Sequence, residues 1–99
     1  PDIVVRQEEA CLSIGDAKYK AKLEEKDRYQ LIAHAVSYGA PKSFLVTPAA
    51  AQDTSGPQFV GKIGPTEVFQ YAFNLDGDLA EQEAAFSSWV RQEMCGINP

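Results

Sequence analysis

The chain has 99 residues, of which 44% are hydrophobic, 23% are charged and 10% are aromatic, and its formal net charge is −5. This composition is typical of one globular domain and excludes a chain that is disordered throughout. No apolar run approaches the roughly 18 residues that a membrane-spanning helix needs, so we expect no insertion into a membrane.

The negative charge lies in the second half of the sequence. Residues 1–50 carry seven basic and seven acidic side chains, whereas residues 51–99 carry two basic and seven acidic ones. An acidic surface repels a phosphate backbone, so we expect no binding to nucleic acid. Such a surface suits another protein with a basic surface as the partner, although an acidic helix that only keeps the chain soluble has the same composition.

The first quarter of the chain indicates β-strands. The run at residues 3–5 is short, apolar and β-branched, and residues 10–25 indicate a hairpin that turns at Gly15-Asp16. After that turn, apolar residues alternate with three lysines, which places the lysines on one face of a strand. The row consists of Lys18, Lys20 and Lys22. It either grips an anion or an acidic protein, or it keeps an exposed strand from pairing with a neighbour.

Residues 27–38 indicate a helix. Asp27 and Gln30 stand at the spacing of a capping box, and Gly39 and Pro41 are stop signals after the last periodic residue. The apolar stripe that we expect to face the core consists of Tyr29, Ile32, Ala33 and Val36.

His34 is the only histidine of the chain. It lies about 140° around this helix from Tyr29, so we expect it to point away from the stripe, towards solvent or a second layer. A Ser-His-Asp or Cys-His site would have to use it, and no acidic partner stands near it in the sequence. We therefore assign no catalytic residues.

Motifs for cofactors and metals are missing from the sequence. It contains no glycine-rich dinucleotide or phosphate-binding motif and no HExxH zinc motif, so we expect no cofactor. The cluster Asp76-Gly77-Asp78 lacks the full ligand spacing of a calcium loop, and a turn followed by a helix cap explains it. We expect no metal site.

Residues 42–95 indicate three strands and a final helix. In the third strand, Phe69, Tyr71 and Phe73 share one face, which we interpret as core. Asp78 has the position of an N-cap for the helix. The expected strands are residues 42–48, 59–63 and 67–73, and the apolar side of the helix consists of Leu79, Ala85, Phe86, Trp89 and Val90.

The order of these elements predicts an α+β fold. We expect a single small domain over residues 1–99, with an antiparallel or mixed sheet of about five strands and two helices, 27–38 and 78–95. The helices are expected to lie mostly on one face of the sheet.

Residues 49–58 are rich in small, polar and turn-forming residues and indicate a loop. This is the longest segment without a pattern, and loops carry binding residues disproportionately. The candidate partner-binding residues are Gln52, Asp53, Thr54, Ser55 and Gln58. A spacer without special function explains the same composition.

The two cysteines, Cys11 and Cys95, are too far apart in sequence for a CxxC redox or zinc motif. We predict a disulfide between them, which would close a loop of about 85 residues and stabilise the domain by roughly 4.5 kcal/mol. A disulfide favours a secreted or periplasmic protein. Two reduced cysteines in a cytosolic protein are the alternative.

These features lead to three hypotheses for function. The first is a small extracytoplasmic protein-binding module, such as an inhibitor, an immunity-type protein or an effector, that acts by surface recognition and not by catalysis. The second is a cytosolic adaptor or regulatory subunit. The third is a small enzyme that uses the amine of Pro1 as a general base, because Pro1 stands directly before a strand, as in tautomerase-type enzymes. The rest of the chain does not follow that family's pattern.

Overall fold

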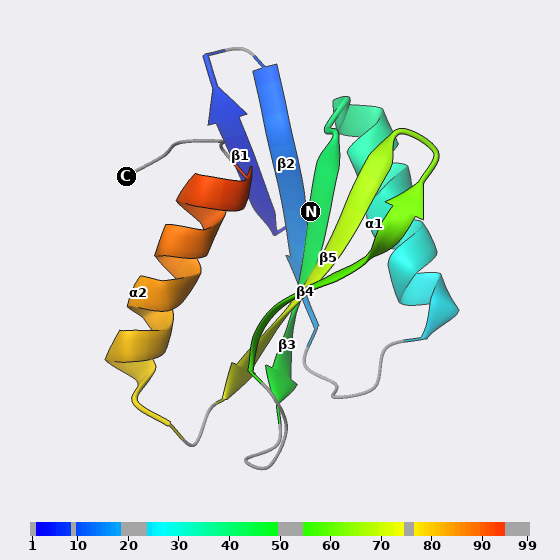
Figure 1. The fold of residues 1–99 in the computed structure, drawn as a ribbon. Helices are drawn as coiled ribbons and strands as arrows, with labels where there is room; N and C mark the ends of the chain where they lie inside the picture. The colour runs from blue at the N-terminus through cyan, green and yellow to red at the C-terminus, as the bar shows by residue number, and fades with distance from the viewer. Residues whose placement is uncertain (1, 9, 19–23, 50–54, 75–76, 95–99) are drawn as a thin grey trace.

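The computed structural model describes residues 2–8, 10–18, 24–49, 55–74 and 77–94. These residues form a five-stranded mixed sheet with two helices, so the predicted α+β class is confirmed (Figure 1). The elements are β1 (Ile3–Gln7), β2 (Ala10–Ala17), α1 (Glu25–Tyr38), β3 (Lys42–Ala49), β4 (Gly56–Ile63), β5 (Thr66–Asn74), α2 (Leu79–Trp89) and a π-helical turn η1 (Val90–Met94). Within this part of the chain, no helix is both long and apolar enough to cross a membrane.

The sheet has a parallel centre and antiparallel edges. Its strand order is β1-β2-β3-β5-β4. The pairs β2–β3 and β3–β5 are parallel, whereas β1–β2 and β5–β4 are antiparallel. Parallel neighbours need a long crossover connection, and α1 supplies it between β2 and β3. A tight turn at Gly64, whose φ of 58° suits glycine, joins β4 to β5.

The predicted turn at Gly15-Asp16 is wrong, because β2 continues through both residues. β2 pairs instead with β1, in a register that runs from Ile3 opposite Gly15 to Gln7 opposite Ala10. The glycine serves close packing between strands: a Cβ atom at position 15 would lie less than 3.0 Å from the ring of Phe44. A turn and a close approach both require glycine, so the local signal misled the prediction.

The two helices cover opposite faces of the sheet, and the prediction that they lie mostly on one face is wrong. Phe44 and Leu45 are neighbours in β3 that point to opposite faces, and both are fully buried. Each face of the central strands therefore needs its own cover. The α1 side of the core consists of Ile14, Leu31, Ala35, Ala40, Leu45 and Val68.

Of the apolar stripe predicted for α1, only Ile32 packs against the core. Tyr29 and Val36 are 63% and 62% exposed, whereas Leu31 and Ala35 are fully buried. The helix also begins earlier than predicted: Glu24 is the N-cap, and Asp27, placed at N3, accepts a hydrogen bond from the Glu24 N–H at 2.8 Å. The small side chain of Ala35 lets this face of α1 approach the sheet closely.

Aromatic side chains fill the α2 side of the core. The ring of Trp89 lies 5.5 Å from that of Phe44 and 5.1 Å from that of Tyr71. The aromatic face predicted for β5 is therefore a core face. Burial raises the pKa of Tyr71 above its ordinary value, so the phenol stays neutral. Asp78 caps α2 as predicted, with its carboxylate accepting hydrogen bonds from two backbone N–H groups.

Candidate functional site

The predicted binding loop is shorter in the structure than in the sequence interpretation. β3 continues to Ala49 and β4 begins at Gly56, so strands take up both ends of the 49–58 segment. Ser55 is exposed directly before β4, and Gln58 is exposed within β4, opposite Gln70. Three of the predicted binding residues, Gln52, Asp53 and Thr54, lie outside the described residues, and the set stays a prediction.

Exposed apolar side chains gather on α1 and β4. Among the described residues, eight large hydrophobic side chains are exposed, and six of them lie on these two elements. The six are Tyr29, Val36 and Tyr38 on α1 and Phe59, Val60 and Ile63 on β4. Scattered exposed hydrophobic residues need no explanation. Three of the six, Tyr29, Val36 and Ile63, line hollows on the α1 side of the sheet.

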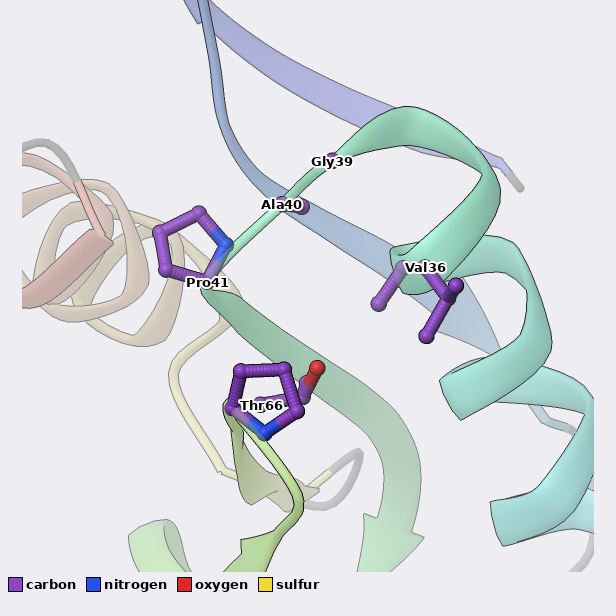
Figure 2. Close-up of a pocket in the computed structure, with 7 residues that line it drawn as sticks. Val36, Gly39, Ala40, Pro41 and Thr66 are labelled. Carbon is purple, nitrogen blue, oxygen red and sulfur yellow. The ribbon is translucent and has the colours of Figure 1, made fainter.

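Two hollows lie between α1 and the β4–β5 hairpin. The larger one, of about 240 Å³, has Val36 of α1 on one side and Thr66 of the hairpin on another (Figure 2). Ala35 and Pro65 also line it. The segment after α1 completes its lining with Gly39, Ala40 and Pro41. We call the two hollows together the hairpin groove.

The smaller hollow, of about 180 Å³, is lined by Tyr29, Glu25 and Arg28 of α1 and by Ile63 of β4. Ile63 in this hollow and Pro65 in the larger one stand on either side of the Gly64 turn. The hairpin groove is thus an apolar surface that includes Tyr29, Val36 and Ile63, with charged side chains at one end.

The groove is open because α1 packs against β2, β3 and β5. None of the eight residues of β4 is buried. Phe59 turns to the other face of the sheet, where its ring contacts that of Phe69 at 5.3 Å and is still 55% exposed. β4 is therefore the least covered part of the sheet next to the groove.

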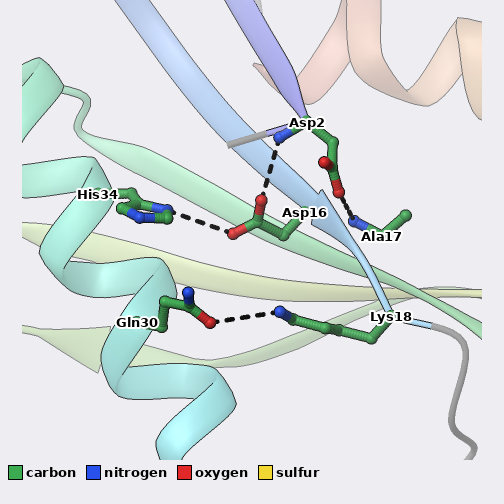
Figure 3. Close-up of polar contacts among 6 residues, drawn as sticks. All are labelled: Asp2, Asp16, Ala17, Lys18, Gln30 and His34. Carbon is green, nitrogen blue, oxygen red and sulfur yellow. Dashed lines mark hydrogen bonds and ion pairs between the residues drawn. The ribbon is translucent and has the colours of Figure 1, made fainter.

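A polar cluster links β1, β2 and α1 on the α1 side (Figure 3). Nδ1 of His34 lies 3.5 Å from Oδ2 of Asp16, whose side chain is only 9% exposed. The other oxygen of Asp16 accepts a hydrogen bond from the Asp2 N–H at 3.0 Å, and the Asp2 carboxylate accepts one from the Ala17 N–H at 2.9 Å. His34 thus has an acidic partner that the sequence did not reveal, and it faces the sheet.

This pair connects α1 to β2. Neither hollow of the hairpin groove includes His34 or Asp16. Lys18 donates a hydrogen bond to Gln30, one helical turn before His34, while the other lysines of the predicted row lie outside the described residues. Within the described ranges, no group of three or more His, Cys, Asp or Glu side chains could hold a metal ion.

We expect Asp16→Ala to lower the free energy of unfolding by about 1–3 kcal/mol, because the Asp2 N–H loses its acceptor and His34 loses its partner. His34→Ala should lower the free energy of unfolding by about 1 kcal/mol. The double variant should lower it by less than the sum of the two single losses. Urea denaturation of the four proteins measures this coupling. As a control, Asp78→Ala combined with His34→Ala should be additive, and additive losses for Asp16 and His34 would contradict the link.

Cys11 has a free thiol in the structure. Its sulfur donates a weak hydrogen bond to the carbonyl oxygen of Ser13, and its side chain packs on the α1 side of the core. The turn η1, which precedes the second cysteine, belongs with Met94 to the opposite side. Cys95 itself lies outside the described residues, and the structure gives no support to the predicted disulfide.

Comparison of the chain with protein-family models, with curated proteins and with solved structures finds no match. The hairpin groove and strand β4 are therefore the features from which a function is inferred.

Proposed function

We propose that this chain is a protein-binding module that recognises another protein through the hairpin groove and the adjoining strand β4, without catalysis. One observation carries the proposal: three of the exposed large hydrophobic side chains of the described residues, Tyr29, Val36 and Ile63, line the groove. Burying such side chains against a partner removes apolar surface from water, which is the main driving force of association.

The size and lining of the groove favour a protein over a small molecule. Small-molecule sites are usually clefts of roughly 300–1,000 Å³ with a few convergent polar groups. The two hollows are smaller, at about 240 and 180 Å³. Tyr29 and Arg28, which line the smaller hollow, belong to the residue types that dominate binding energy in protein interfaces. An apolar centre with charged side chains at its rim is the usual anatomy of such an interface.

An inhibitor, an immunity-type protein and an effector all need only a recognition surface, and each fits the proposal. The secreted or periplasmic location depended on the disulfide between Cys11 and Cys95. With Cys11 a free thiol, the described residues favour that location no more than the cytosolic location of an adaptor. The enzyme hypothesis depended on Pro1, which lies outside the described residues.

We expect Ile63→Lys to weaken partner binding, because it places a charge beside Tyr29 in the smaller hollow. The tagged protein is used to capture its partner from the organism that carries the gene, and the affinity of the purified partner is then measured by calorimetry. Ile63→Lys should weaken binding at least tenfold without changing the melting temperature, since Ile63 is 46% exposed.

Leu79→Lys is the matched control, because Leu79 is an aliphatic residue of similar exposure, 50%, at the start of α2. It should bind the partner as the wild type does. If Leu79→Lys loses the partner and Ile63→Lys keeps it, the recognition surface lies on the α2 side and the proposal is wrong.

A further inference from the structure

Building on the proposed function, we infer that the outer edge of β4 accepts an extended, positively charged segment of another protein as an added strand. β4 lies at the end of the strand order, and no other strand of the described residues pairs with its outer edge. The main-chain groups along such an edge are ready to pair with an incoming chain. Natural proteins usually guard these edges with short strands, charges, prolines or bulges.

The two edge strands of this sheet are protected from pairing with another chain to different degrees. β1 has five residues, carries Arg6 and has a bulge at Val5/Arg6. β4 has eight residues and a bulge at Phe59/Gly61, and its proline and its only charged residue, Pro57 and Lys62, stand near its two ends. The residues between Pro57 and Lys62 are therefore uncharged, and Phe59 and Val60 among them are exposed.

Both faces beside this edge offer apolar contacts to an added strand. Side chains of a strand alternate between the two faces of a sheet. On the α2 side the added strand would meet the exposed ring of Phe59, which rests on Phe69. On the α1 side it would border Ile63 and the hollow that also includes Tyr29. Main-chain hydrogen bonds then give affinity, and the groove gives specificity, as in other cases of strand addition.

The charge of the chain favours a basic partner over a second copy. Residues 55–94, which include β4 and α2, carry two basic and six acidic side chains, and the whole chain has a net charge of −5. A second copy carries the same charge and is repelled, whereas a segment rich in lysine or arginine is attracted. We therefore assign the edge to a basic segment of a different protein.

The test uses the full chain, labelled with ¹⁵N, and two synthetic octapeptides: one alternates valine and lysine, and the other alternates valine and glutamate. The lysine peptide should shift the NMR signals of β4 amides and slow their hydrogen exchange. It should bind at least tenfold more tightly than the glutamate peptide, and its affinity should fall as salt is added. Shifts confined to β1 or to α2, equal binding of the two peptides, or no binding would each overturn the inference.

Val60→Lys places a charge in the centre of the β4 edge and should weaken binding of the lysine peptide at least tenfold. Val4→Lys is the matched control on the opposite edge, because Val60 and Val4 are 40% and 36% exposed. It should leave binding of the lysine peptide unchanged.

Light scattering on the unliganded protein should give a monomer. A dimer that Val60→Lys converts to a monomer would assign the edge to a second copy instead.

The two proposals fail in different ways. If the natural partner is lost by Ile63→Lys but kept by Val60→Lys, the groove recognises the partner and strand addition is wrong. If both variants keep the partner, the proposed function fails as well.

Discussion

Trp89→Ala is expected to lower the free energy of unfolding by about 3–5 kcal/mol. Trp89 is buried and holds α2 on the sheet, because its ring contacts those of Phe44, Phe69 and Tyr71 on β3 and β5. Removing the indole deletes these contacts and leaves a cavity that the β-sheet side cannot fill without moving. The total free energy of unfolding of a small domain is only about 5–15 kcal/mol, so the variant should be close to unfolding at physiological temperature.

Denaturation by urea, followed by far-UV circular dichroism, measures this loss. Fluorescence cannot be used for the comparison, since Trp89 is the only tryptophan of the chain. Phe59→Ala is the control, because Phe59 is also aromatic and contacts Phe69 but is largely exposed. This variant should lower the free energy of unfolding by less than about 1 kcal/mol. Equal losses for the two variants would mean that α2 is not docked through Trp89.

Gly15→Ala is expected to destabilise the protein by about 1–3 kcal/mol, although alanine is usually at least as favourable as glycine in a strand. The new Cβ atom would lie less than 3.0 Å from the ring of Phe44, on the neighbouring strand β3. Phe44 is fully buried and packs against Trp89, so its ring cannot move away without disturbing the core. The added methyl group therefore forces strain into the sheet.

Gly61→Ala is the matched control, because Gly61 also lies in a strand, on β4, and a Cβ atom there meets no neighbouring atom within 4 Å. It should be neutral or slightly stabilising. Replacing Phe44 by leucine should reduce the additional cost of Gly15→Ala, since the smaller side chain leaves room for the methyl group. If both glycine variants melt at the same temperature, Phe44 does not require glycine at position 15.

Element types were predictable from the sequence where the pattern was local. The Asp78 cap and the alternation of Phe69, Tyr71 and Phe73 depend on residues close to one another, and the structure agrees with both. The position of helix 27–38 was predicted to within two residues, since α1 is Glu25–Tyr38.

The orientation of that helix could not be predicted in the same way. Leu31 and Ala35 face the core, and Tyr29 and Val36 do not, because contacts with strands distant in the sequence decide which side of the helix is buried. The spacing of Tyr29, Ile32, Ala33 and Val36 along the helix favoured a stripe of which only Ile32 packs against the core. The spacing of Leu31, Ala35 and the capping Asp27, each four residues apart, was the signal in the sequence for the correct one.

The candidate site escaped the sequence interpretation because its parts are distant in the chain. Tyr29 and Ile63 come together only when β4 takes the edge position next to β5. His34 and Asp16 likewise meet only when α1 crosses from β2 to β3. A search for unpatterned segments led instead to residues 49–58, since loops are the one kind of binding element that local composition can reveal.

The parallel centre of the sheet has a consequence for how the chain folds during synthesis. Lys42, at the start of β3, pairs with Ser13 on one side and with Glu67 on the other, both far away in sequence. Non-local pairing of this kind slows folding, because the entropy of a long loop is lost before the contacts form. During synthesis, β3 can therefore pair with a neighbouring strand on one edge only until β5 has left the ribosome. A chain that stops before β5 exposes the apolar residues of β3.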